Sequence, residues 1–183
     1  GLLTPQQFIT HAKQLGLISP IGYWSLEQIS RDIQSMQILN ISPINISFNV
    51  AYEQFVAPKF VSTVETILTS YGIDGSRFEF ELGENDFVSK LGDLSDDMSN
   101  LEKLGISFSL DDFGTGSTSL TQLQRLPIKT IKLDKSHVQK VTNDKDSYNI
   151  VKAMIDLAHG LKLKVVAEGV ETEKQKSFLT ENK

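Results

Sequence analysis

The sequence predicts an α/β domain in which five strands alternate with helices and form part of a barrel. Helical and strand-like segments alternate along the 183 residues, which implies right-handed βαβ crossovers and a mainly parallel sheet. Each strand-like segment has one apolar and one polar phase, whereas parallel strands covered on both faces usually read as continuous apolar runs. The polar phase therefore favours a barrel whose outer helices cover the apolar phase.

The first elements are predicted from capping residues and apolar spacing. Residues 4–7 form a capping box with proline at the first helical position, and this helix is expected to run to Gly16. Apolar residues at 3-4-3 spacing predict a second helix over 26–36. Alternation then predicts a strand at 44–50, and a third helix at 60–71 is ended by the glycine that follows.

The same signals continue in the second half of the chain. A strand is predicted at 78–82, a helix at 98–104 ended by a glycine, and a strand at 106–111. A short helix at 120–126 is ended by proline, and the next strand is expected at 130–134.

The last elements are a helix over 150–158, a strand at 165–168 and a helix opened by a second capping box at 172–175. Each of the five strands places one polar residue near its carboxyl end. These residues are Asn49, Glu81, Asp111, Lys132 and Glu168. Oxygen ligands of this kind suit magnesium, manganese or calcium better than zinc. A sheet that faces solvent is the alternative explanation.

Two adjacent carboxylates, Asp111 and Asp112, stand where an apolar strand ends and a glycine-rich loop, residues 113–119, begins. Adjacent carboxylates repel unless a cation or a proton neutralises them. A divalent metal at the rim of a sheet or barrel is one explanation, and an aspartate that caps the next turn is the other.

Composition restricts the functions that remain. With 39% hydrophobic and 22% charged residues, no membrane-length apolar run and no signal peptide, the chain is expected to be soluble. The absence of cysteine excludes disulfides and thiolate metal sites. A net charge of −5 without a basic block argues against general nucleic-acid binding but allows a small anionic ligand held through metals. The three histidines, His11, His137 and His159, are interpreted as surface or packing residues.

Several motifs resemble those of the EAL domain, the bacterial phosphodiesterase that linearises cyclic di-GMP. Residues 45–50 resemble the family's "VNLS" strand, and residues 79–84 its "ELTE" strand. Residues 111–116 reproduce "DDFGTG", whereas 131–134 and 166–171 are similar to "KID" and "VAEGVE". The resemblance covers nearly the whole chain in order.

The resemblance implies a variant TIM-like (β/α)8 barrel and two-metal hydrolysis with Mg²⁺ or Mn²⁺. It implies metal ligands at Asn49, Glu81, Asp111, Asp112 and Glu168. Lys132 is expected to orient or activate the attacking water, with Glu171 beside it as a catalytic or supporting residue. Asp134 is expected on the substrate side, and Glu84 is expected to anchor the glycine-rich loop.

The chain also departs from the family pattern. Gly83 replaces a usual threonine, Ser117 a usual tyrosine, and His137 a common phenylalanine, which we interpret as a packing change. The Glu-Ala-Leu strand and the last strand, with its Gln-Gly-Tyr motif, have no counterpart. We therefore expect residues 1–183 to be an incomplete EAL-type domain, with about five of the barrel strands present, and to be inactive when isolated.

The predicted function is a cytoplasmic cyclic di-GMP phosphodiesterase domain that yields linear pGpG, either free or as the cytoplasmic part of a membrane-anchored protein. Expected partners are a second copy of the domain and sensory or GGDEF domains, fused or separate. The alternative is a non-catalytic EAL-like module that binds cyclic di-GMP or a protein. A barrel aldolase or isomerase that uses Lys132 as a Schiff base is disfavoured, because Asp111 and Asp112 would then lack a purpose.

Overall fold

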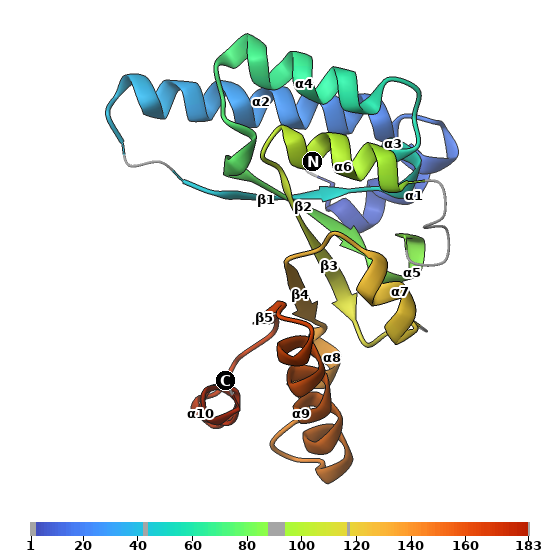
Figure 1. The fold of residues 1–183 in the computed structure, drawn as a ribbon, viewed down its shortest axis with the longest axis vertical. Helices are drawn as coiled ribbons and strands as arrows, with labels where there is room; N and C mark the ends of the chain where they lie inside the picture. Colours follow the sequence, from blue (N-terminus) through green and yellow to red (C-terminus); the bar gives the residue numbers. More distant parts are fainter. Residues whose placement is uncertain (1–2, 42–43, 88–93, 117, 183) are drawn as a thin grey trace. The chain divides into compact units, whose positions relative to one another are not determined.

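The computed structural model describes residues 3–41, 44–87, 94–116 and 118–182. Within these residues the five predicted strands are confirmed (Figure 1). They form one sheet in chain order, with β3, β4 and β5 parallel. The strands are β1 (Ile46–Val50), β2 (Phe78–Gly83), β3 (Ser107–Phe113), β4 (Thr130–Leu133) and β5 (Lys164–Ala167).

The chain folds as two compact units. The first comprises residues 1–80 and 96–107, and the second comprises 81–95 and 108–183. The helices are α1 (Pro5–Gln14), α2 (Ile18–Ile38), α3 (Tyr52–Phe55), α4 (Phe60–Tyr71), α5 (Glu84–Phe87), α6 (Ser95–Lys103), α7 (Leu120–Arg125), α8 (Lys135–Val138), α9 (Lys145–Gly160) and α10 (Glu173–Glu181), with a 3-10 turn at Gly75–Arg77.

The first unit is built around aromatic side chains. Helices α2 and α4 pack side by side (Figure 1). Phe80 of β2 is fully buried, and its ring lies against those of Phe48, Phe60 and Phe78, at centroid separations of 5.7, 6.3 and 6.4 Å. These contacts fix the start of β2, the strand whose second half enters the other unit.

The second unit contains the carboxyl ends of β2 to β5. Its apolar phase is buried through Leu110, Ile131 and Leu133, with α9 packed against β5. The polar phase is also buried there, since Ser109 is 0% exposed and Thr130 only 4%. The solvent-facing sheet that we considered as an alternative is therefore wrong for β3 and β4, whereas β5 alternates between exposed and half-buried residues.

Element boundaries differ from the sequence prediction at particular places. The expected capping box at Thr4 and the left-handed glycine after α4 are both present. Strand β3 continues to Phe113, two residues beyond its expected end. The four-residue helices α3, α5 and α8 were not predicted, because one turn is too short to show a helical period.

No helix among the described residues combines the length and the apolar character that a bilayer crossing requires.

We expect Phe80→Ala to lower the free energy of unfolding by about 3–5 kcal/mol, because it removes a fully buried ring from an aromatic cluster. Urea denaturation monitored by circular dichroism measures the change. Trp24→Ala is the control, since Trp24 is 65% exposed and its loss should cost less than about 0.5 kcal/mol. Equal losses in the two variants would contradict this description of the core.

Candidate active site

The ammonium group of Lys132 lies among three carboxylates from three other strands or strand ends. Its Nζ is 2.6 Å from Glu168 Oε1, 2.9 Å from Glu81 Oε1 and 3.6 Å from Asp111 Oδ1. Glu81 is only 5% exposed. The structure thus brings together four of the residues singled out in the sequence, at the carboxyl ends of β2 to β5. We call these four residues (Glu81, Asp111, Lys132 and Glu168), together with the adjacent Asp112, the acidic cluster.

A β-bulge in β3 explains how two successive aspartates enter one cluster. Leu110 pairs with Ile131, but the next pair joins Phe113 to Leu133, so Asp111 and Asp112 together stand opposite Lys132 alone. An extra residue of this kind re-aims a side chain that regular alternation would send to the other face. Asp112 adopts φ = +55°, and its N–H donates to Asp111 Oδ1 at 3.0 Å.

The charges of the acidic cluster are only partly balanced. Burial by itself lowers the pKa of Lys132, but hydrogen bonds to Glu168 and Glu81 and the attraction of Asp111 outweigh it, so the net pKa is raised. Lys132 is therefore an ammonium at neutral pH.

The pKa values of the two aspartates are also raised, which disfavours their charged forms. Burial is the main cause that raises the pKa of Asp111, and the Lys132 charge opposes it only in part. The pKa of Asp112 is raised by burial and by repulsion from Asp111 and Asp134. One ammonium therefore leaves excess negative charge in the cluster, which a cation could neutralise.

Glu84 binds the glycine-rich loop through several backbone groups. Its Oε2 accepts from the N–H groups of Gly114 and Gly116 at 2.8 and 3.0 Å, and its Oε1 accepts from that of Thr118 at 3.1 Å. Glu84 is 3% exposed. A Cβ on Gly116 would lie 2.8 Å from the Glu84 carboxyl carbon, so this approach requires a glycine.

The hydrogen bonds also set the charge state of Glu84. Burial by itself raises the pKa of this carboxyl, but the hydrogen bonds from the loop outweigh burial, and the net pKa is below its ordinary value. The carboxylate remains charged at neutral pH and acts as an acceptor only.

Two further predicted site residues have other partners, and a third belongs to the first unit. Asp134 is the N-cap of α8, where it accepts from the N–H of Ser136 at 2.9 Å and from its hydroxyl; these bonds lower the pKa of Asp134. Glu171 is exposed and accepts from Gln139 Nε2 at 3.1 Å. Asn49 is exposed on β1, in the first unit, so the acidic cluster described here does not include it.

The structure describes the surroundings of two of the three residues that depart from the family pattern. A Cβ on Gly83 would meet nothing within 4 Å, so a threonine would fit there. Ser117 lies outside the described residues. His137, expected as a packing residue, also contacts the carbonyl oxygen of Gly114 through Nε2 at 3.0 Å. No periodicity or motif signals this contact, because it joins residues 23 positions apart.

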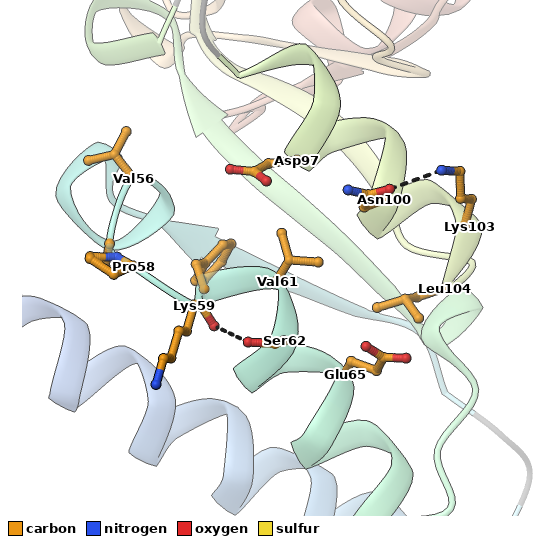
Figure 2. A pocket seen from close by; sticks show the side chains of 12 residues that line it. Val56, Pro58, Lys59, Val61, Ser62, Glu65, Asp97, Asn100, Lys103 and Leu104 are labelled. Atoms are coloured by element: carbon orange, nitrogen blue, oxygen red, sulfur yellow. Dashed lines mark hydrogen bonds between the residues drawn. The ribbon is translucent and has the colours of Figure 1, made fainter.

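The first unit contains a separate cavity of about 580 Å³, which lacks the features of an active site (Figure 2). It lies between the start of α4 and α6. Lysines and acids both line it, and Asn100 accepts from Lys103 at 2.9 Å. It therefore concentrates neither charge nor a set of like ligands.

Polar side chains at the carboxyl ends of parallel strands are where α/β barrels build their active sites. The fold and the acidic cluster together are therefore typical of a domain of the α/β-barrel class. Residues 1–183 match the EAL domain family over their whole length, and the chain belongs to that family.

Named relatives agree with this assignment. The chain is 36% identical over 180 residues to the bifunctional diguanylate cyclase/cyclic di-GMP phosphodiesterase MucR of Pseudomonas aeruginosa, with 98% of this chain and 26% of that protein aligned. It is 32% identical over 182 residues to the cyclic di-GMP phosphodiesterase PdeR of Escherichia coli, covering all of this chain and 27% of that protein. The chain thus spans about a quarter of the length of these curated relatives.

Solved structures match the whole fold. The P. aeruginosa MucR phosphodiesterase in complex with c-di-GMP superimposes with a TM-score of 0.88 at 35% sequence identity, covering 100% of this chain and 74% of that one. The EAL enzyme Bd1971 in its cGMP-bound form gives a TM-score of 0.88 at 29% identity, with 100% and 51% covered. The TIM-like architecture predicted from the sequence is thereby confirmed.

The donor chemistry of the acidic cluster fits a hard divalent cation. Its four acids, Glu81, Asp111, Asp112 and Glu168, offer only carboxylate oxygens, the ligands that magnesium, manganese and calcium prefer. In the part of the chain that the structure describes, no three acidic or histidine side chains are already spaced to hold one ion. Three of the carboxylates point instead at the Lys132 ammonium, which occupies the place of positive charge among them.

We expect Glu84→Gln to lower the free energy of unfolding by about 2 kcal/mol at pH 7, because three N–H donors lose a charged acceptor. The folded-state pKa is depressed, so the contribution is complete above the unfolded value of 4.5 and is lost as pH falls through the lower folded value. Urea unfolding of both proteins between pH 7 and pH 3 measures the difference, which should shrink below pH 4.5.

Glu173→Gln provides the control for this series, since Glu173 is exposed and pairs with Lys176 at 3.5 Å on the same helix. Its effect should be within about 0.5 kcal/mol at every pH. A Glu84→Gln difference that stays constant from pH 7 to pH 3 would show that the carboxylate charge does not hold the loop.

Proposed function

We propose that this domain hydrolyses cyclic di-GMP to linear pGpG with two divalent cations, magnesium or manganese. The observation that carries the proposal is the acidic cluster, in which Glu81, Asp111 and Glu168 surround Lys132 and Asp112 adds a further carboxylate. Family membership and relatives of 32–36% identity whose names include cyclic di-GMP phosphodiesterase support the choice of substrate.

The acidic cluster supplies the ligands in this proposal. Glu81, Asp111 and Glu168 would hold the cations, and Asp112 would be a ligand of the second. The family pattern implies Asn49 as a further ligand. When bound, two cations polarise the phosphodiester oxygens and provide a nucleophile from water at neutral pH.

Lys132 has a role that follows from its charge. Its pKa is raised, so the amine carries no free lone pair at neutral pH and cannot accept a proton from water. It acts as a donor that orients the attacking water or a phosphate oxygen. It also keeps the carboxylates together before cations bind, because it offsets part of their mutual repulsion.

Asp134 and Glu171 complete the proposed site on the substrate side. Asp134 is held in one orientation by its bonds to Ser136 at the start of α8. Glu171 is held by Gln139 at 3.1 Å. Both are acceptor-only groups when charged, suited to the hydroxyl and N–H donors of a nucleotide or to a bound water.

The whole protein is proposed to work in the cytoplasm as a homodimer of this domain, linked to sensory or GGDEF domains. The relatives are much longer than the aligned region, which covers 23–27% of three of them. That difference leaves room for such domains in proteins of this family.

In the complete protein, we expect Asp111→Asn to lower kcat by about 100-fold or more, the scale of losing one electrostatic stabiliser. Without metal, the variant's melting temperature should equal or exceed the wild-type value, because the change relieves repulsion with Asp112. Added Mn²⁺ should raise the melting temperature of the wild type by mass action and that of the variant far less. Product formation and thermal melts with and without Mn²⁺ measure the three effects.

Asp156→Asn is the matched control, since Asp156 is exposed on α9 and pairs with Lys152 at 3.3 Å. It should retain wild-type turnover and the full Mn²⁺ effect. Full activity in Asp111→Asn would remove Asp111 from the metal ligands. Binding of cyclic di-GMP by the wild type without hydrolysis would instead identify a non-catalytic binding module.

A further inference from the structure

We propose that His137 is a positioning residue that, together with Glu84, clamps the glycine-rich loop at Gly114 and so fixes the bulge that carries Asp111 and Asp112. The consequence for cation binding rests on the proposed function, whereas the clamp itself does not. His137 was expected to serve packing only, and its hydrogen bond to Gly114 is what suggests more.

Both backbone polar groups of Gly114 are held by side chains from different helices. Its N–H donates to Glu84 Oε2 of α5 at 2.8 Å, and its carbonyl oxygen lies 3.0 Å from His137 Nε2 of α8. A carbonyl oxygen can only accept, so Nε2 must carry the proton. Both the neutral Nε2–H tautomer and the imidazolium satisfy this bond, so protonation of the ring at Nδ1 leaves the clamp in place.

The contact depends on the absence of a side chain at position 114. Gly114 has φ = +99°, and a Cβ there would lie 3.0 Å from His137 Nε2 and 2.5 Å from Met154 Cε. The imidazole and the thioether therefore occupy the space that any other residue would need. The ring is half-buried, which partly shields its hydrogen bond from water.

The clamp acts on a strained part of the chain. Asp112, two residues before Gly114, adopts φ = +55°, a conformation that costs an aspartate on the order of 1 kcal/mol and persists only where surrounding contacts determine it. Within the loop, the carbonyl of Asp112 accepts from the N–H and the hydroxyl of Thr115, at 3.2 and 2.9 Å. Glu84 and His137 add the contacts that tie this turn to other elements.

Helix α8 also connects the clamp to the acidic cluster by a short covalent path. It begins at the N-cap Asp134, two residues after Lys132 on β4. The loop carbonyl that His137 holds lies two residues after Asp112 on β3. The two strand ends that face each other at the bulge are thus joined a second time, through His137 and Gly114.

Phenylalanine fills a volume similar to that of histidine without a hydrogen-bond donor. His137→Phe therefore removes the hydrogen bond and keeps the packing. In metal-free complete protein, we expect it to speed hydrogen exchange at the Gly114 and Gly116 amides about 5- to 10-fold, the factor for one hydrogen bond. Mn²⁺ affinity measured by calorimetry should fall about 10-fold, as for a group that orients a metal ligand.

His137→Gln keeps a donor nitrogen on a flexible chain and should recover most of both losses. His159→Phe is the matched control, since His159 is an exposed histidine in the last turn of α9 and should change neither readout. Exchange and affinity in His137→Phe equal to wild type would overturn the proposal and leave His137 as a packing residue. Losses in His137→Gln as large as in His137→Phe would overturn it as well, because the donor would then be irrelevant.

The two proposals fail in different ways. Wild-type protein that binds no Mn²⁺ would refute the proposed metal chemistry, yet the exchange rates of metal-free protein would still decide the clamp. Normal Mn²⁺ binding with unchanged exchange in His137→Phe would refute the clamp and leave the proposed function standing.

Discussion

The arrangement of the second unit depends on a single positive charge placed among carboxylates. Four acids at strand ends would repel one another, and desolvation of the buried Glu81 and the half-buried Asp111 and Glu168 makes this worse. Lys132 allows the strand ends to meet, because its ammonium contacts Glu81, Asp111 and Glu168. Four acids against one ammonium leave an excess of negative charge, which a cation could neutralise. In the proposed function, the same ammonium therefore influences both the packing of the strand ends and the binding of cations.

The glycine-rich loop shows a second use of charge. A carboxylate offers several lone pairs, and that of Glu84 accepts hydrogen bonds from the N–H groups of three loop residues that lie outside the strands. This replaces the regular ladder that β3 loses beyond Phe113. The loop is thus organised by hydrogen bonds to side chains rather than by an apolar core of its own. Its order should depend on the contacts of a few residues, Glu84 above all.

Much of this fold could be predicted from the sequence, and the reasons are specific. Alternation in Ile131–Lys132–Leu133 located β4, and left-handed glycines marked the ends of helices, as Gly72 does. The acidic cluster could be anticipated because parallel strands bring their carboxyl ends together. The bulge could not, since the pattern of Asp111 and Asp112 is the same whether β3 ends or continues past them. The contact of His137 with Gly114 was also hidden, because it depends on where α8 lies and not on local pattern.

The bulge in β3 means that segment length is as important as residue type at this site. Asp111 and Asp112 share Lys132 as their opposite residue only because β3 holds one residue more than β4 in this stretch. Deleting a single residue there would restore regular alternation and turn one carboxylate to the other face of the sheet, even with every functional side chain still encoded. A substitution near the bulge can have a small or a large effect on the site, but a change in length always shifts the register of the strand. Related sequences that function alike should therefore tolerate exchange of residues around the bulge while keeping the spacing between the strand and the first glycine unchanged.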